Sequence, residues 1–357
     1  MKKQYVIPIF VPHLGCPNDC IFCNQKSISG QLKPVTSQNV KDTIEFFLDK
    51  LNEENSEKEV AFFGGSFTGI EREKQEELLS VAYEYVKEGK ISSIRISTRP
   101  DYITKDILKM LKKYNVKTIE LGVQSSNDFI LSRCKRNHSF EDVKKASKLI
   151  RRHGFTLGHQ MMIGLPDSTR IDDLNTAKDL AKLKPKMMRI YPVLVIKGTE
   201  LEKEYESGEY TPLNLNQAVE LSKELYYYFT KKNINVIRIG LQNTDLISNP
   251  EKEESQVVAG PYHEAFGQLV EDGVWYDSIV ERIKQFNVKV KEVEITVNPQ
   301  NVSNVVGHKK ENTNKLKDLY NVDLVIVQDK NKQLGKFDLK ILKTYNDFLE
   351  ENKTAEV

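Results

Sequence analysis

Three cysteines stand within eight residues near the start of the chain, at positions 16, 20 and 23 of "VPHLGCPNDCIFCNQ". Thiolates are soft donors that bind iron and zinc, and a loop with this CxxxCxxC spacing can wrap three sulfurs around one centre. A structural zinc ion takes four protein ligands, whereas a cubane iron–sulfur cluster on three cysteines leaves one iron open. The pattern therefore predicts a catalytic iron–sulfur centre on Cys16, Cys20 and Cys23.

Zinc remains the alternative for these residues, because His13 lies three residues before Cys16 and could complete a Cys3His site. Zinc modules usually bring a second ligand pair from farther along the chain, and Cys134 stands alone. The cationic neighbours of Cys134 in "RCKRNHS" could lower its pKa, but a bystander thiol is the preferred interpretation.

Composition and the start of the chain indicate which cellular compartment the cysteines occupy. The 357 residues carry a formal charge of +2, and 39% of them are hydrophobic, which is typical of a globular chain. The sequence contains no apolar run near the roughly 20 residues of a membrane span. The start "MKKQYVIPIFVPH" has only a short apolar run, broken by Pro8 and Pro12. We expect a cytoplasmic protein with no membrane partner, in which clustered cysteines bind metal rather than form disulfides.

Short β-like runs alternate with amphipathic helical stretches in the first 200 residues. Six such repeats predict a parallel sheet with right-handed crossovers. The expected fold is α/β, a partial (β/α)6 barrel of the triose-isomerase type with a small C-terminal α/β extension; an open doubly wound sheet is the alternative. The predicted strands are 5–11, 59–65, 93–98, 118–124, 156–164 and 188–196, and the predicted helices are 37–54, 74–89, 104–114, 139–154 and 170–183.

Capping residues mark the ends of several of these helices. Ser37, Thr104 and Ser139 are predicted N-caps, and Gly89 and Gly154 are predicted to end two helices. Farther on, the pattern predicts a helix at 214–233, strands at 234–241, 289–299 and 322–328, and helices at 303–320 and 340–352. We expect two domains, residues 1–275 and 285–357.

Unusual residues follow each predicted strand. The cysteines come after the first, and "GGSFTG", "STRPDY", "GVQSS", "IGLPDST" and "VIKGTE" follow the others. In barrels of this type the chemistry lies at the carboxyl ends of the strands. The six segments are therefore predicted to share one rim.

CxxxCxxC after the first strand of such a repeat resembles the radical S-adenosylmethionine (SAM) enzymes, in which an aromatic residue usually precedes the third cysteine, as Phe22 does here. The resemblance implies a [4Fe–4S] cluster whose open iron is chelated by the amino and carboxylate groups of SAM. An electron then cleaves SAM to a 5′-deoxyadenosyl radical that abstracts hydrogen. A flavodoxin or ferredoxin is the expected electron donor.

The same resemblance gives roles to the rim segments. Gly64, Gly65 and Ser66 match the family's GGE-type motif, which binds the methionine ammonium, although Ser66 replaces the usual acid. Core packing is the alternative for Met162. The remaining SAM contacts implied by position are Ser97, Arg99, Gln124, Met162 and Ile163.

Longer strings, including "STRPDYI", "LGVQSSNDFIL" and "GHQMMIGLPDST", look like the radical domain of the elongator catalytic subunit over roughly residues 5 to 270. That family modifies the wobble uridine of tRNA at carbon five. "AGPYHEAFGQLVE" and "GHKKEN" look like shorter bacterial elongator-like proteins. About 85 residues follow position 270, too few for the elongator acetyltransferase domain, so carboxymethylation is not carried over.

Three functions stay open at this point. The leading one is a radical SAM enzyme acting on RNA, with tRNA as the implied substrate. The second is the same chemistry on a small molecule or a peptide, and the third is a non-catalytic metal-bearing RNA-binding module. Arg189 and Tyr191 are candidates for the cavity wall, and His159 is interpreted as a hydrogen-bonded core residue. The sequence does not indicate the oligomeric state.

Overall fold

The computed structural model describes residues 4–11, 20–24, 34–51, 56–244 and 246–347. The chain divides into two compact units: unit 1 comprises Met1–Leu221 and Tyr228–Glu264, and unit 2 comprises Ser222–Tyr227 and Ala265–Val357. The predicted limits, 1–275 and 285–357, cut through the helix α10 (Phe266–Lys284), which in the structure belongs to unit 2.

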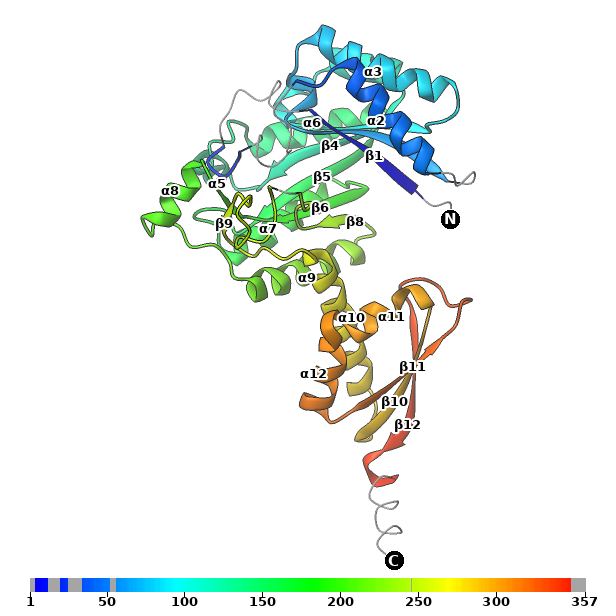
Figure 1. The fold of residues 1–357 in the computed structure, drawn as a ribbon. Helices are drawn as coiled ribbons and strands as arrows, with labels where there is room; N and C mark the ends of the chain where they lie inside the picture. The colour runs from blue at the N-terminus through cyan, green and yellow to red at the C-terminus, as the bar shows by residue number, and fades with distance from the viewer. Residues whose placement is uncertain (1–3, 12–19, 25–33, 52–55, 245, 348–357) are drawn as a thin grey trace, which may run out of the picture. The chain divides into compact units, whose positions relative to one another are not determined.

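Unit 1 is built on a parallel sheet that forms a half-barrel (Figure 1). The described strands pair in the order β1-β2-β3-β4-β5-β6-β8, and every pairing is parallel. The predicted partial barrel is confirmed, and the predicted strand at 234–241 joins it as a seventh. The strands are β1 (Gln4–Val11), β2 (Glu57–Gly64), β3 (Ser93–Thr98), β4 (Val116–Gln124), β5 (Thr156–Ile163), β6 (Met187–Pro192) and β8 (Asn235–Ile239).

Amphipathic helices connect these strands and cover the sheet (Figure 1). Their apolar residues recur at the three- and four-residue spacing that places them on one face, as Val40 and Ile44 show in α2. In α6 the buried face includes Val143, Ala146 and Ile150. The helices are α2 (Ser37–Lys50), α3 (Arg72–Lys87), α4 (Lys105–Lys113), α6 (Phe140–Arg152), α7 (Arg170–Lys182) and α9 (Leu215–Lys231).

Helix ends agree with the predicted caps in all but one case. Thr104 and Ser139 are N-caps whose hydroxyls accept backbone N–H groups. Gly89 and Gly154 follow α3 and α6 with positive φ. The prediction of Ser37 is wrong: Thr36 caps α2, in a reciprocal pair with Asn39, because a capping box needs its partner three residues on.

The polypeptide between the main elements adds short pieces that the sequence did not reveal. The predicted strand 188–196 breaks after Pro192, and β7 (Val195–Ile196) pairs antiparallel with β9 (Val257–Ala259) in a separate ribbon. Two short helices, α5 (Asp128–Arg133) and α8 (Glu200–Glu206), were too brief to show an apolar period. Three-residue 3₁₀ turns at Phe67–Gly69 and Pro100–Tyr102 follow β2 and β3.

Unit 2 contains α10 and a three-stranded sheet of order β11-β10-β12 within the described residues. Here β10 (Val290–Val297) pairs parallel with β11 (Asp323–Gln328) and antiparallel with β12 (Phe337–Thr344). The predicted helix 303–320 is interrupted at Gly307, giving α11 (Val302–Val306) and α12 (Glu311–Tyr320).

The predicted last helix, 340–352, is wrong for residues 340–344, which belong to β12 (residues 337–344), whereas residues 345–347 are helical. Phe337, Leu339 and Ile341 pack against the apolar cluster of unit 2. Their spacing of two is the period of a strand, and it outweighs the helix-forming residues nearby. None of the helices in the described ranges has both the length and the apolar composition needed to cross a membrane.

Replacing Thr36 and Ser37 in turn tests where α2 begins. Thr36→Ala is expected to lower the free energy of unfolding by about 1 kcal/mol, because it leaves the N–H of Asn39 without its acceptor. Ser37→Ala is the matched control and should change it by less than about 0.5 kcal/mol, since the Ser37 hydroxyl bonds only the exposed Glu77. Urea unfolding followed by circular dichroism measures both, and equal losses would contradict the assignment.

Candidate functional site

The carboxyl ends of the unit 1 strands open into a pocket of about 240 Å³. Ten of the twelve predicted site residues line it. Cys16 lies outside the described residues, and Ile163 is fully buried in β5 without lining the pocket. The ten lining residues are Cys20, Phe22, Cys23, Gly64, Gly65, Ser66, Ser97, Arg99, Gln124 and Met162.

A tight turn presents two of the thiols to this pocket. The N–H of Cys23 donates to the carbonyl of Cys20 at 2.8 Å, so both side chains leave the same turn. Between them the buried Ile21 anchors the segment: its N–H donates to the Cys134 carbonyl and its carbonyl accepts from Leu201. Cys20 belongs to an apolar cluster, and Cys23 packs against it.

Arg136 lies next to the first of these sulfurs. Its Nη1 is 3.5 Å from Cys20 Sγ, its Nη2 donates to the Gly122 carbonyl at 2.6 Å, and its Nε is buried without a partner. A guanidinium in this position favours a negatively charged group at the sulfur. In the sequence Arg136 stands out only as a cationic neighbour of Cys134.

Cys134 has a different character. It is fully buried, and burial raises the pKa of its thiol to about 12. A thiol that stays protonated is a poor nucleophile and metal ligand. The bystander interpretation of Cys134 is therefore supported, and the thiols of Cys20 and Cys23 are set apart by their access to the pocket.

Glycines leave the backbone at the end of β2 exposed to the pocket that Cys20 and Cys23 also line. Gly64 has φ +106°, and a Cβ there would lie 2.6 Å from the Val11 carbonyl oxygen. The following N–H, of Gly65, donates to that same carbonyl, which ties the ends of β1 and β2 together. A side chain at Gly64 cannot be accommodated, so the backbone itself forms this wall of the pocket.

Hydroxyls and amides form the next part of the wall. Ser66, which replaces the acid of the resembling motif, is buried, contacts Thr98 Oγ1 at 2.8 Å and accepts from the Arg99 N–H at 3.1 Å. Arg99 forms an ion pair with Asp101. Gln124 has a buried Oε1 without a hydrogen-bond partner, so an acceptor remains available at the end of β4.

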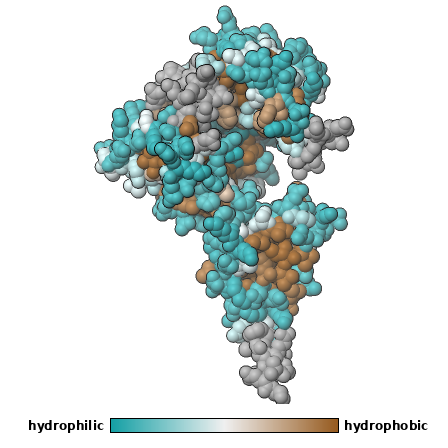
Figure 2. Space-filling model, viewed as in Figure 1, coloured by the Kyte–Doolittle hydropathy of each residue, from teal (hydrophilic) through white to brown (hydrophobic). Residues whose placement is uncertain are grey.

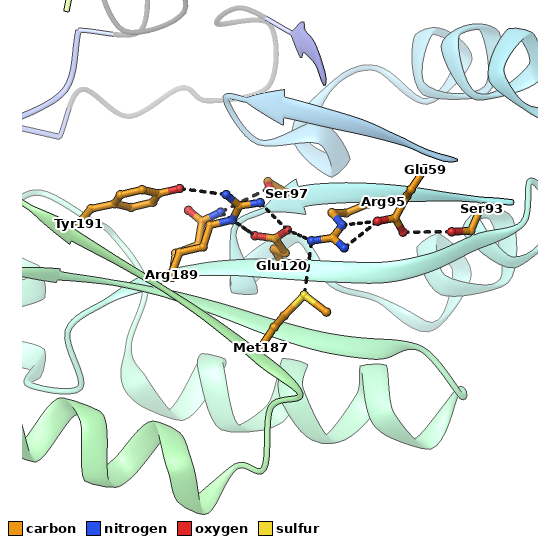
Figure 3. A network of polar contacts seen from close by, with 9 residues as sticks. Glu59, Ser93, Arg95, Ser97, Glu120, Met187, Arg189 and Tyr191 are labelled. Carbon is orange, nitrogen blue, oxygen red and sulfur yellow. Dashed lines mark hydrogen bonds and ion pairs between the residues drawn. The ribbon is translucent and has the colours of Figure 1, made fainter. Parts of the chain in front are cut away.

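Below these residues a charged network fills the interior of the half-barrel (Figure 3). Glu120 on β4 accepts from Arg189 Nε at 2.5 Å and from Arg95 Nη1 at 2.8 Å, and Arg95 also pairs with Glu59. Tyr191 lies beside Arg189. The two carboxylates balance the two guanidiniums, so the network is neutral as a whole.

Glu120 is only 1% exposed and is the centre of this network. Burial alone raises the pKa of its carboxyl, but the adjacent Arg189 and Arg95 outweigh that effect and hold the pKa below its usual value. Glu120 is therefore ionised at neutral pH and fixes both arginines. Sequence reasoning missed it, because an acid inside a strand has no signature of spacing.

The pocket wall carries positive charge. Arg99, Arg136, Arg189 and Arg238 line it, and none of its described lining residues is acidic. Arg238 is next to Arg189 in the register of β6 and β8, and it donates to the carbonyls of Gly240 and Leu241. Arg136 and Arg238 have no carboxylate partner among the described residues. Such a pocket suits an anionic ligand.

His159 does not belong to the site. It is fully buried, and its Nε2 lies 2.9 Å from Ser147 Oγ on α6. Burial lowers the pKa of its imidazole to about 3, so the ring stays neutral. The interpretation as a hydrogen-bonded core histidine is confirmed, whereas Arg189 and Tyr191 do line the pocket.

Comparison with known proteins agrees with this site. The model of the radical SAM superfamily matches residues 10–180, and that of the radical SAM C-terminal domain matches residues 185–275. A protein of Methanocaldococcus jannaschii is 31% identical over 230 residues, which are 62% of this chain and 70% of that protein. The chain belongs to the radical SAM superfamily.

Elongator-like proteins are among the relatives. A tRNA uridine(34) acetyltransferase of Methanocaldococcus infernus is 28% identical over 255 residues, covering 60% of this chain and 48% of that protein. The solved structure of Elp3 from the same organism, lacking its N-terminus, superposes with a TM-score of 0.60 and 25% identity, covering 79% of this chain and 64% of that one. The chain thus spans about half the length of the acetyltransferase.

The residues present fit the cofactors of this superfamily. Cys20 and Cys23 are soft donors at the pocket, and Cys16 is the third cysteine of their motif. Two buried polar atoms on the wall, Arg136 Nε and Gln124 Oε1, have no protein partner. Buried polar atoms normally find partners, so these two indicate a polar ligand in the pocket.

Replacing Glu120 tests the network. Glu120→Gln is expected to lower the free energy of unfolding by about 3 to 5 kcal/mol, because it leaves the buried Arg95 and Arg189 without their shared carboxylate. Glu57→Gln, an exposed acid on β2, is the matched control and should cost less than about 0.5 kcal/mol.

Comparing Glu120→Gln with the wild type at several pH values tests the ionised state of Glu120. Because the folded state lowers the pKa of Glu120, its contribution is present at neutral pH and is lost as the pH falls through the folded pKa. The stability difference between wild type and Glu120→Gln should narrow in acid, as urea titrations at several pH values would measure. A difference that stays constant would contradict the ionised state of Glu120.

Proposed function

We propose that this radical SAM enzyme holds a [4Fe–4S] cluster on Cys16, Cys20 and Cys23, binds SAM in the unit 1 pocket and modifies RNA, with tRNA as the substrate. The observation that carries the proposal is the position of Cys20 and Cys23 in one pocket with the open backbone of Gly64 and Gly65. With its cofactors bound, the site would supply hydrogen-atom abstraction by a 5′-deoxyadenosyl radical. The electron would come from an external donor such as flavodoxin or ferredoxin.

Each part of the wall then has a distinct task. Arg136 offers N–H donors and positive charge 3.5 Å from the Cys20 sulfur, where it can contact an anionic ligand. Gly64 allows a ligand to reach the backbone, and Gln124 provides an unused acceptor for an ammonium or hydroxyl group. The aromatic rings of Phe10, Phe22 and Phe63 line the same pocket and keep water from a reactive radical.

An RNA substrate is supported by charge and by the relatives. Arg136 and Arg238 line the wall without a carboxylate partner among the described residues, and bonds to backbone carbonyls hold both, so they can meet a phosphate without rearranging. Several relatives are named tRNA uridine(34) acetyltransferases, and another is an elongator complex protein, the group that the strings of this chain resemble.

The cysteines allow a test within one residue type. Cys20→Ala and Cys23→Ala are expected to remove the cluster and all reductive cleavage of SAM, because each deletes a metal ligand. Cys134→Ala is the matched control and should keep both, since the Cys134 thiol is buried and stays protonated. Anaerobic reconstitution, iron analysis and detection of 5′-deoxyadenosine measure the outcome, and a cluster that survives in Cys20→Ala would contradict the assignment.

The substrate needs a separate experiment. A strain lacking the gene should lose one modified nucleoside from its tRNA, as mass spectrometry of total nucleosides would show. Wild-type protein should restore it, and Cys20→Ala should not. Nucleosides that do not differ between the strains would exclude RNA and favour a small-molecule or peptide substrate for the same chemistry.

A further inference from the structure

In unit 2 a strand, two helices and a second strand follow one another, with a glycine-containing basic loop between the helices. The strand β10 leads to α11, the loop Gly307–Lys310 joins it to α12, and β11 returns beside β10 in parallel. We propose that the surface formed by the Gly307–Lys310 loop, α11 and β11 binds the backbone of single-stranded RNA. The choice of RNA as the ligand rests on the function proposed above. The inference that this surface binds an anionic polymer does not depend on that function.

The backbone of this loop has a positive φ angle at three of its four residues. Gly307 has φ +78°, and a Cβ there would lie 2.8 Å from the backbone nitrogen of Asn312. Lys309 and Lys310 follow with φ +50° and +64°, a left-handed conformation that is uncommon for lysine. Both side chains are exposed. Two consecutive lysines therefore adopt an unfavourable backbone conformation, which other contacts of the loop must stabilise.

Buried polar contacts supply that support. The carboxylate of Asp272 on α10 accepts the N–H of His308 at 2.8 Å. Asn312 donates to the backbone carbonyls of Asp272 and Asn304 at 2.8 and 2.9 Å. Asp272, Asn304 and Asn312 are all buried, so these bonds are shielded from water. The loop is thus fixed from below, and its lysines are left for solvent or a ligand.

Charge around the loop favours an anionic partner. Between Val302 and Lys336 the chain carries seven lysines and four acids. Of the acids, Glu311 is paired with Lys315 and Asp323 with Lys317, whereas Lys309 and Lys310 form no ion pair with a described residue. Two exposed lysines without an ion-pair partner on a fixed loop can therefore contact more than one phosphate.

A second basic loop lies at the start of α11. The loop from Asp329 to Lys336 joins β11 to β12, and Asn298 and Asn301, which precede α11, hydrogen-bond to its backbone. Lys330 and Lys336 on this loop are exposed and form no ion pair with a described residue. Cationic loops therefore occur before and after α11, which gives a strand of nucleic acid more than one phosphate contact.

Apolar surface is available for the bases. Figure 2 shows an apolar patch on unit 2, in the region of α11 and β11. Val302 on α11 and Leu324 and Ile326 on β11 are only partly buried although they pack against the core. β11 is also the outer strand of its sheet, so backbone groups on its free side have no partner strand. Unstacked bases can use both features.

This arrangement resembles that of KH-type modules, in which a GXXG loop clamps the backbone of four nucleotides. Here the loop reads Gly-His-Lys-Lys, and Lys310 takes the place of the second glycine. The left-handed φ of Lys310 keeps the backbone conformation that a glycine would adopt. The substitution adds charge where phosphate would lie. A duplex cannot offer its bases to such a surface, so single-stranded RNA is the expected ligand.

Reversing the loop charge tests the proposal on the full chain. Fluorescence anisotropy with a labelled single-stranded RNA of about twelve nucleotides, three times the length that a KH loop clamps, measures affinity. Lys309→Glu/Lys310→Glu is expected to weaken binding about tenfold or more. It should also reduce the slope of log affinity against log salt by about 1.4, because two phosphate contacts are lost.

A matched pair of adjacent exposed lysines serves as the control. Lys231→Glu/Lys232→Glu, at the end of α9, makes the same charge change and should leave affinity within twofold. Thermal melting verifies that both variants are folded. An equal loss in the two variants, no loss in the loop variant, or equal binding of duplex RNA would overturn the proposal. Tighter binding of DNA of the same sequence would overturn the assignment to RNA.

Cofactor chemistry separates this proposal from the preceding one. Without RNA, Lys309→Glu/Lys310→Glu should still produce 5′-deoxyadenosine at the wild-type rate. Cys20→Ala should lose that product but bind RNA normally. If the wild-type protein binds RNA but does not cleave SAM, the proposed function is contradicted and the proposed RNA-binding surface is supported. If the protein cleaves SAM but its RNA binding does not depend on the loop, only the RNA-binding surface is contradicted.

Discussion

The structure of unit 1 depends on one constraint: parallel strands joined by helical crossovers bring all their carboxyl ends to the same edge. Residues more than 200 positions apart, such as Cys20 and Arg238, therefore line one pocket. The half-barrel adds an interior side to the sheet, and side chains that alternate along each strand point either to the helices or to this interior. His159 takes the first direction and Glu120 the second.

An interior of this kind cannot be filled only with apolar residues if it is to hold a polar cofactor. Glu120 resolves the conflict, because one buried carboxylate positions two guanidiniums and cancels much of their charge. Burying the charges is costly unless all of them are paired, so the network holds each arginine in one geometry. The charge that remains on the wall, from Arg136 and Arg238, is then available to a ligand.

A feature could be predicted from the sequence when the residues that determine it lie close together along the chain. Strands and long helices have periods that are visible locally, and Thr104 and Ser139 cap where expected. Thr36 was missed in favour of Ser37 because the choice depends on Asn39, three residues on. Residues 340–344 of β12 fall within the predicted helix 340–352, because the strand partner that decides their structure, β10, lies some forty residues earlier. Arg136 and Glu120 acquire meaning only from neighbours on other strands, which spacing alone does not reveal.

Pocket size bears on how an RNA substrate would be held. A cavity of about 240 Å³ is smaller than most ligand sites, so little of a nucleic acid could be enclosed in it. Contacts to a single reacting base specify the site of reaction, whereas affinity for nucleic acid comes mainly from phosphates. Under the proposed function, an RNA substrate would therefore be bound mainly through backbone contacts elsewhere on the surface. The lysines of the Gly307–Lys310 loop would provide such contacts at little cost, because an already ordered loop loses little entropy on binding.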